Sequence, residues 1–150
     1  MILKEATVEN IDLLFIWVND KSVRESAFNS KVIAYQEHKD WFYKKLNSSN
    51  CKIYIGYVND YPIGQVRIDI EEDIAIIDYS VDRRYRGKGY GVLLLEALAN
   101  KVKNFDRKID KLIGNVKYSN LSSQRTFDKA GYNRQNQKES IFFYKKIETA

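Results

Sequence analysis

The stretch DYSVDRRYRGKGYGVLLLEAL, residues 78–98, passes from an alternating apolar pattern typical of a strand to an apolar pattern typical of a helix. Between the two patterns lie three glycines and four basic residues, at positions 87, 89 and 91 and at positions 83, 84, 86 and 88. The unpaired N–H groups at the start of a helix attract anions, and glycine lets the backbone come close to them. The stretch therefore predicts a phosphate-binding turn between a strand and a helix.

Two well-known phosphate loops do not fit this turn. A Walker A loop requires GxxxxGK followed by Ser or Thr, and the chain lacks that pattern here. A dinucleotide fingerprint requires GxGxxG early in a βαβ unit, whereas these glycines follow three consecutive predicted strands within residues 51–81. A plain solvated turn is the remaining alternative, but it has no need of four basic side chains beside its glycines.

The composition narrows the class of protein. The chain has 150 residues, of which 44% are hydrophobic and 30% charged, as in one ordinary globular domain spanning 1–150. No apolar run approaches the roughly 20 residues that span a bilayer, and MILKEATVEN has no basic leader before an apolar block. Cys51 and His38 are the single cysteine and histidine, so we expect neither a disulfide nor a metal site. We therefore expect a cytoplasmic protein with no membrane partner.

Charge alone leaves the ligand open. The net charge of +5 suits a phosphate-bearing cofactor and nucleic acid equally well. The basic residues nevertheless coincide with a glycine loop rather than with a continuous stripe carrying exposed aromatic residues. We therefore expect no nucleic-acid partner, and keep a nucleic-acid-binding module as the alternative from another class.

Apolar periodicity predicts an α/β protein of the α+β kind, with a mixed, mostly antiparallel central sheet and helices on both faces. Strand patterns cover residues 2–6, 51–58, 62–70, 73–81, 111–117 and 140–147. Helix patterns cover residues 7–18, 20–28 and 35–46, the segment after the glycine loop, and residues 120–131. Thr7 and Asn120 are expected N-caps, and Gly131 is expected to end the last helix.

Two motifs together resemble those of one family. Arg86-x-x-Gly89-x-Gly91 resembles the pyrophosphate loop of the GNAT acetyltransferase superfamily. Downstream, NLSSQRTFDKAGY at residues 120–132 resembles the Asn-x-x-Ser-x-x-x-(Tyr/Phe)-x-Lys-x-Gly-(Phe/Tyr) segment of the same superfamily, at the right spacing. The resemblance covers essentially the whole chain and implies the GNAT fold and an acetyl-CoA site.

The resemblance also implies roles for individual residues. The backbone of Tyr79, Ser80 and Val81 would pair with the pantetheine arm, and the Val81 N–H would donate to the thioester oxyanion. The full implied cofactor set is Tyr79, Ser80, Val81, Arg86, Gly87, Lys88, Gly89, Tyr90, Gly91, Asn120, Ser123 and Lys129. Helix capping is the alternative role for Asn120 and Ser123.

In this superfamily an amine attacks the thioester directly, so a base must first take its proton. Asp78 and Asp69 are the best-placed carboxylates, and His38 is a third candidate; for each of them a structural role is the alternative, such as pairing of Asp69 with Arg67. We expect Cys51 to be a small core residue rather than a nucleophile.

The usual proton donor of the superfamily is a tyrosine four residues after the motif serine, where this chain has Phe127. The departure leaves the proton donor open, with Tyr118, Ser119, Tyr132 or a water as substitutes. It does not abolish the chemistry, because a thiol with a pKa of about 8.5 leaves without much assistance.

The acceptor region, residues 17–46, resembles the subgroup that acetylates nucleotide-linked amino sugars of the pseudaminic-acid type. The resembling residues are Trp17, Asn19, Asp20, Val23, Arg24, Phe28, Asn29, Ser30, Ile33, His38, Trp41 and Phe42. Arg24 could fork onto a phosphate, Trp17 or Trp41 could stack on a base or sugar, and Asn29 and His38 could bind hydroxyls. Alternatively, the tryptophans belong to the core and Arg24 pairs with a nearby acid.

The resemblance therefore implies an acetyl-CoA-dependent N-acetyltransferase with a small-molecule amine acceptor. Three alternatives stay open for its role: acetylation of a protein N-terminus of the ribosomal-protein type, acetylation of another small amine, and a CoA sensor without activity. The sequence also leaves open whether the protein forms a homodimer.

Overall fold

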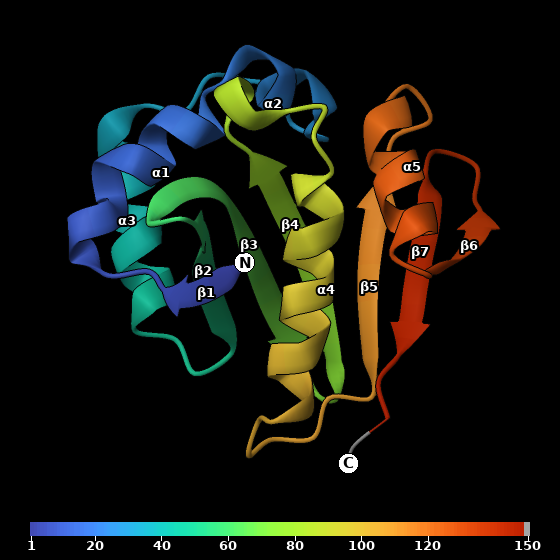
Figure 1. Ribbon diagram of the computed structural model, residues 1–150. Coiled ribbons are helices and arrows are strands. Elements are labelled where there is room, and N and C mark those ends of the chain that lie inside the picture. Colours follow the sequence, from blue (N-terminus) through green and yellow to red (C-terminus); the bar gives the residue numbers. More distant parts are fainter. Residues whose placement is uncertain (149–150) are drawn as a thin grey trace.

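The computed structural model describes residues 1–148, which build one seven-stranded sheet in the order β1-β2-β3-β4-β5-β7-β6 (Figure 1). The strands are β1 (Ile2–Glu5), β2 (Cys51–Val58), β3 (Tyr61–Glu71), β4 (Ile74–Val81), β5 (Lys111–Val116), β6 (Asn133–Asn136) and β7 (Ile141–Lys146). The helices are α1 (Ile11–Val18), α2 (Lys21–Ser26), α3 (Tyr35–Leu46), α4 (Tyr90–Lys103) and α5 (Leu121–Lys129), with 3-10 turns η1 (Val8–Asn10) and η2 (Arg83–Tyr85). The β4–β5 pair is parallel and the other five pairs are antiparallel, which confirms the predicted sheet.

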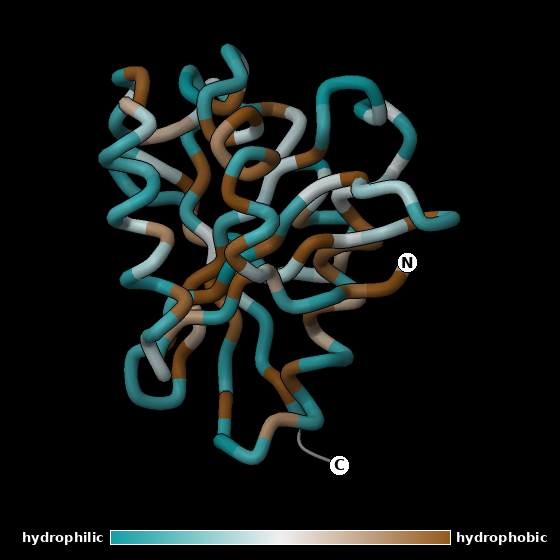
Figure 2. Tube along the Cα trace, turned by 90° about the vertical axis from the view of Figure 1, so that its left-hand side faces the viewer, coloured by the Kyte–Doolittle hydropathy of each residue, from teal (hydrophilic) through white to brown (hydrophobic). Residues whose placement is uncertain are grey.

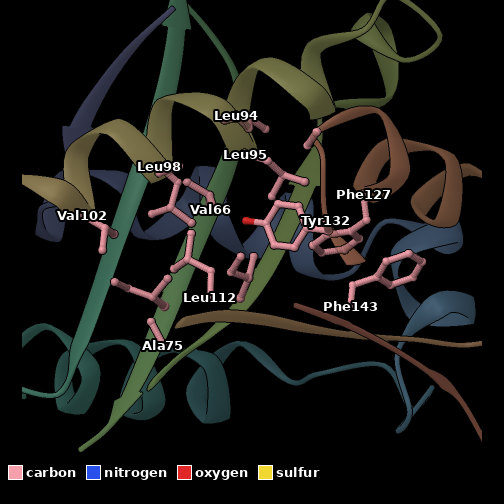
Figure 3. Close-up of a cluster of buried hydrophobic side chains, with 14 of the residues drawn as sticks. Val66, Ala75, Leu94, Leu95, Leu98, Val102, Leu112, Phe127, Tyr132 and Phe143 are labelled. Carbon is pink, nitrogen blue, oxygen red and sulfur yellow. The ribbon is translucent and has the colours of Figure 1, made fainter. Parts of the chain in front are cut away.

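One face of the sheet is covered by α4 and α5. Alternation along β3 turns Val66, Ile68 and Ile70 to this face, where all three are buried. Figure 3 shows the apolar stripe of α4 directed at the strands, with Leu94, Leu95, Leu98 and Val102 close to Val66, Ala75 and Leu112. The helical spacing of the leucines thus places α4 on the sheet, with its start at the glycine loop.

The opposite face of the sheet is covered by α1 and α3. Leu14, Trp17 and Phe42 from these helices pack on Cys51, Ile53 and Ile55 of β2 in a second buried cluster. The polar residues of β3, at positions 65, 67 and 69, share this face, as their alternation predicts. Figure 2 shows hydrophobic segments gathered where the chain crosses the middle of the molecule, with hydrophilic residues on the outer turns.

Strands β4 and β5 separate after a short paired stretch. They pair only where Ile74–Ile76 meets Lys111–Ile113, and they diverge beyond it (Figure 1). Within residues 1–148, the later part of β4, residues 77–81, has no strand partner on its β5 side. This opening positions the site described below.

The structure adds two elements that the pattern does not predict. Strand β6 pairs with β7, but all four of its residues are exposed and polar, so it carries no apolar alternation. The first predicted helix is divided into η1 and α1, because Thr7 and Asn10 form a capping box around a 3-10 turn. Among the described residues 1–148, no helix is both long and apolar enough to cross a membrane.

Candidate active site

A cavity of about 930 Å³ opens where β4 and β5 separate, and it continues between α1, α2 and α3. Most of the predicted site residues line it, namely Trp17, Arg24, Asn29, His38, Trp41, Asp78, Tyr79, Ser80, Val81, Arg86, Gly87, Gly89, Tyr90, Gly91, Asn120, Ser123 and Lys129. Lys88 and Asp69 are outside this lining. The fold therefore gathers residues from both ends of the chain around the glycine loop.

The β4 wall of the cavity presents unpaired backbone groups. The Asp82 N–H donates to the Ile63 carbonyl at 2.7 Å, and the register pairs Ser80 with Gln65. Because antiparallel pairs alternate, the N–H groups of Tyr79 and Val81 point away from β3, toward the opening. An unpaired strand edge of this kind can bind an extended amide-containing ligand.

This alternation corrects one prediction. The backbone of Ser80 faces β3, so it cannot pair with the pantetheine arm as expected; its hydroxyl accepts from Gln65 Nε2 at 3.3 Å. The Tyr79 N–H has the same orientation as the Val81 N–H, so both groups face the opening. The register of β4 against β3 decides which backbone groups face the opening, and the sequence pattern alone does not fix this register to one residue.

The glycine loop owes its shape to positive φ angles. Gly87 has φ 76° and Gly89, the N-cap of α4, has φ 82°, a region that side-chain-bearing residues rarely adopt. Within residues 1–148, a Cβ on either glycine would meet nothing within 4 Å. Glycine is therefore needed for the backbone conformation, and the space in front of the loop is open. Gly91 serves a different purpose, since its Cβ would lie 3.1 Å from Thr126 Cγ2 on α5.

The Arg86 side chain does not reach into this space. Its Nε donates to the Val81 carbonyl at 3.0 Å, while Nη1 and Nη2 contact Ser22 Oγ and Asp20 Oδ1 at 2.7 and 2.9 Å. The guanidinium therefore ties the loop to the end of β4 and to the start of α2.

Asn120 and Ser123 combine capping with a place in the cavity wall. Asn120 Oδ1 accepts from the Ser123 N–H at 3.1 Å, which is the capping role that the sequence left as an alternative. The Tyr79 hydroxyl donates to Ser123 Oγ at 2.9 Å and joins α5 to β4. Burial raises the pKa of Tyr79 further above the ordinary phenol value, so the hydroxyl stays neutral.

Among residues 1–148, Asp78 is one of two carboxylates in the cavity lining, with Glu37 as the other. Its Oδ2 accepts from Gln65 Nε2 at 3.1 Å and lies 3.9 Å from Arg67 Nη1. Within residues 1–148, Oδ1 accepts no hydrogen bond, and the side chain is 56% exposed. One oxygen is thus held in place while the other is available to take a proton.

Asp69 lies away from the cavity as an ion-pair partner. Its oxygens contact Lys45 Nζ at 2.9 Å and Arg67 Nε at 3.0 Å. Burial opposes ionisation, but the hydrogen bonds and charges of Lys45 and Arg67 prevail and lower the pKa of Asp69. The structure therefore gives Asp69 the structural role that the sequence left as its alternative.

His38 reaches the cavity from a packed position. It is 3% exposed, and its Nε2 lies 3.1 Å from the Ile11 carbonyl, which can only accept and so assigns the proton to Nε2. Its ring stacks on Phe42, with the centroids 5.9 Å apart. Burial lowers the pKa of His38, which keeps the imidazole neutral.

Trp17 belongs to the core, as one of the alternatives had it. It is buried in the cluster of α1 and α3, and its Nε1 donates to Asp82 Oδ2 at 2.8 Å. This bond fixes α1 to the segment that follows β4.

Arg24 holds the loop between α2 and α3. Its Nε donates to the Val18 carbonyl at 2.7 Å, and Nη1 donates to the carbonyls of Asn29 and Lys31 at 3.1 and 3.2 Å. These bonds occupy the donors that a phosphate fork would need, so the predicted phosphate contact of Arg24 does not fit the geometry. The Asn29 side chain accepts from the Lys31 N–H at 3.2 Å in the same loop.

Arg67 is the residue that sequence reasoning missed as a part of the site. It lines the cavity, and its guanidinium lies 5.0 Å from the centre of the Trp41 ring. Arg67 could have been identified from its position on the polar face of β3, opposite Asp78 in the β3–β4 register.

Phe127 fills the core below the cavity instead of donating a proton. It is 2% exposed and stacks on Phe143 at 5.0 Å, and a Cβ on Gly114 would overlap its ring. The substitutes that the sequence offered, Tyr118, Ser119 and Tyr132, are absent from the cavity lining among the described residues 1–148. The Tyr132 hydroxyl points into the apolar cluster (Figure 3).

Cys51 is buried at the start of β2, and burial, followed by the nearby Asp69 charge, raises the pKa of its thiol to about 11. The predicted core role fits this position. No cluster of three or more His, Cys, Asp or Glu in residues 1–148 is arranged to hold a metal ion.

Several solved structures share this fold. AAC(6')-Ib in complex with ribostamycin and coenzyme A superposes with a TM-score of 0.85 and 21% identity, covering 96% of this chain and 92% of the other. Spermidine N-acetyltransferase from Vibrio cholerae, in complex with CoA and spermine, gives a TM-score of 0.85 and 12% identity, with coverage of 97% and 95%. RimL, a ribosomal L7/L12 alpha-N-protein acetyltransferase, gives 0.83 and 15%, with coverage of 97% and 93%. Identities this low establish the fold alone.

No curated protein sequence matches the chain significantly. The narrower resemblance to enzymes of nucleotide-linked amino sugars is not supported by these structural neighbours. A family model described as the acetyltransferase (GNAT) family matches residues 17–132, which include the β4 edge, the glycine loop and α5. The predicted superfamily and the predicted acetyl-CoA-dependent activity are thereby confirmed. The chain belongs to the GNAT acetyltransferase family, and the protein is an acyltransferase.

Proposed function

We propose that the protein transfers an acetyl group from acetyl-CoA to the primary amine of a nucleotide-linked amino sugar. The observation that carries the transfer is the unpaired edge of β4, residues 77–81, which leads directly into a glycine loop with open space in front of it. In the proposed complex the pyrophosphate lies at the loop and the start of α4, and the pantetheine arm pairs with Tyr79 and Val81.

The chemistry follows from three groups of this chain. Asp78 Oδ1 takes the proton of the amine, directly or through a water, so that the nitrogen lone pair can attack the thioester carbon. The N–H group of Val81 stabilises the oxyanion, because it points toward the opening. The Tyr79 N–H lies two residues along the strand, about 6–7 Å away, and pairs with the pantetheine arm. The C–S bond then breaks, and the thiolate leaves and takes a proton from solvent, since a thiol with a pKa of about 8.5 needs little assistance.

The ordered acceptor segment supports the choice of amine. Asn19 clamps the backbone of Ile33 through two hydrogen bonds, of 2.7 and 2.8 Å, so the loop after α2 has one defined path along the cavity. Trp41 lines the cavity beside Arg67, whose guanidinium lies over its ring. The structural neighbours that bind ribostamycin or spermine support a small-molecule amine in general.

An acceptor screen tests the proposal. The protein is incubated with acetyl-CoA and with UDP-linked amino sugars bearing the amine at carbon 2 or carbon 4, and in parallel with N-terminal peptides, and products are identified by mass spectrometry. We expect acetylated sugar nucleotide, and a loss of about 10²- to 10⁴-fold in rate for Asp78→Asn. Acetylation of the peptides alone would show that the acceptor is a protein N-terminus instead.

A further inference from the structure

Arg67 holds a fixed guanidinium at the acceptor end of the cavity. Its Nε donates to Asp69 Oδ2 at 3.0 Å, and its Cζ lies over the Trp41 ring, 5.0 Å from the ring centroid. Asp69 is itself held by Lys45 at 2.9 Å, and the Arg67 side chain is 24% exposed. The position of this charge is therefore set by Asp69 and Trp41 before any ligand binds.

Among the described residues 1–148, the remaining donors of Arg67 have no acceptor within hydrogen-bond distance. A guanidinium carries five N–H groups, and within residues 1–148 neither Nη1 nor Nη2 donates to a protein atom. The nearest carboxylate to Nη1 is Asp78 Oδ2, at 3.9 Å. Arg67 differs in this respect from Arg24, whose Nε and Nη1 are occupied by backbone carbonyls.

Asp78 places a negative charge beside the positive charge of Arg67. The two residues face each other in the β3–β4 register, and both line the cavity. The Arg67 guanidinium, with N–H donors that are free within residues 1–148, thus lies next to the Asp78 carboxylate in the cavity lining. A ligand that carries the opposite charges at the same spacing would satisfy both groups at once.

We propose that Arg67 and Asp78 form a subsite for an acceptor that carries an anionic group, a carboxylate or a phosphate, a few bonds from the amine to be acetylated. The proposal rests on the proposed acetyl transfer at Asp78 and names the acceptor class. Arg67 binds the anion and Asp78 binds the amine, so the short separation of the two side chains selects compounds in which both groups are close. An amino sugar phosphorylated on the neighbouring carbon and an amino acid both meet this condition.

The same geometry disfavours polycations. A second ammonium group next to the reacting amine would lie against Arg67, and two like charges at close range in a partly buried site repel strongly. The spermine and aminoglycoside ligands of the structural neighbours are of this polyamine kind. Arg67 is therefore a specificity-determining residue of this chain.

Matched acceptor pairs test the subsite. The pairs are glucosamine 1-phosphate with glucosamine, and β-alanine with its amide, with spermidine as a polycation. Acetyl-CoA consumption gives kcat/KM, and calorimetry gives the affinity of each compound for protein saturated with CoA. The variants are Arg67→Met, which keeps the stem on Trp41, Arg67→Lys, which keeps the charge without the fork, and Lys138→Met, which removes an equal charge at an exposed turn.

We expect the anionic member of at least one pair to be preferred by about ten- to a hundredfold, the usual value of a charge-assisted hydrogen bond. Arg67→Met should reduce this ratio to near one, Arg67→Lys should keep part of it, and Lys138→Met should leave it unchanged. The phosphate and carboxylate pairs distinguish the two sources of the anion. Melting temperatures measured for each variant show whether it is folded.

Three results overturn the proposal. They are equal or better use of the uncharged amines or spermidine by the wild type, an unchanged ratio in folded Arg67→Met, and no binding of either anionic compound to the CoA-saturated protein. The first two leave the proposed acetyl transfer intact. Failure of the protein to bind acetyl-CoA would instead contradict the proposed function itself.

Discussion

Arg86 Nη2 lies 2.9 Å from Asp20 Oδ1, so the glycine loop is joined to the start of α2, within the acceptor region of residues 17–46. Asp20 is also the N-cap of α2 and accepts from the N–H groups of Ser22 and Val23. Burial opposes its ionisation, but the hydrogen bonds from Ser22 and Arg86 prevail and lower the pKa of Asp20. The contact links the predicted cofactor site with the predicted acceptor site.

Asp20→Asn should uncouple the two sites without unfolding the protein. Asparagine still caps a helix, and the partly exposed ion pair contributes at most about 1 kcal/mol to the free energy of unfolding. Because the loop and the acceptor segment lose their common anchor, we expect kcat/KM to fall by about three- to tenfold for both substrates. Steady-state kinetics check this, with Asp106→Asn, an exposed residue outside the cavity lining, as the control. If Asp20→Asn had the kinetics of the wild type, the contact between Arg86 and Asp20 would be an ion pair without a role in catalysis.

Asp82 predicts a pH dependence of stability. Burial raises its pKa, but the hydrogen bonds from Arg84 and Trp17 outweigh this and lower the pKa to about 2. A carboxyl group whose pKa falls on folding stabilises the protein fully above the unfolded value of about 3.9, and that contribution is lost as the pH falls toward 2.

Between pH 6 and pH 3, Asp82→Asn should therefore lose less stability than the wild type, by about 1 kcal/mol. Urea unfolding at the two pH values measures the difference, and Asp106→Asn serves as the control for removing one exposed carboxylate. If both variants followed the wild type over this range, the bond from Trp17 to Asp82 would have no part in acid stability.

Gly64 should tolerate no side chain. A Cβ there would overlap the Ser80 carbonyl oxygen and lie 3.1 Å from Val81 Cα, so it would push on the end of β4. We expect Gly64→Ala to lower the free energy of unfolding by about 1–3 kcal/mol and to weaken CoA binding. Gly131→Ala is the control, because its φ of 85° is also strained, yet only the flexible Lys145 Nζ lies near its Cβ, at 3.8 Å. If folded Gly64→Ala bound CoA as tightly as the wild type, the end of β4 would have no part in CoA binding.

Cys51 should be inert in the folded protein. Its thiol is buried and has a pKa of about 11, so a thiol reagent at pH 8 should label it only after unfolding. Cys51→Ala should keep kcat within about twofold, since direct transfer needs no cysteine. Rapid labelling of the native protein together with loss of activity would point to a covalent route.

The sequence predicted those parts of the structure that local pattern determines. The leucine spacing of α4, the alternation of β3 and the glycine turn between β4 and α4 all follow from residues close together in the chain. Strand β6 escaped prediction because its four exposed polar residues pair with β7 without any apolar signal.

The site was harder to predict, because tertiary contacts decide what a polar side chain does. Arg24 and Arg67 have the same chemistry, but the carbonyls around Arg24 occupy its donors, while the β3–β4 register directs Arg67 to Asp78. Phe127 likewise shows its core role only once Gly114 and Phe143 are placed against it. Such partners lie far away in sequence, so no local pattern reveals them.

Calorimetric titration of acetyl-CoA into the wild type, Gly89→Val and Gly131→Val tests the central claim most directly. Both glycines have positive φ, 82° and 85°, so valine strains each backbone to a similar extent, but only Gly89 forms the loop at the start of α4. We predict that the wild type and Gly131→Val bind acetyl-CoA, and that folded Gly89→Val does not. Equal binding by Gly89→Val and Gly131→Val, or no binding by the wild type, would contradict the placement of the cofactor at this loop.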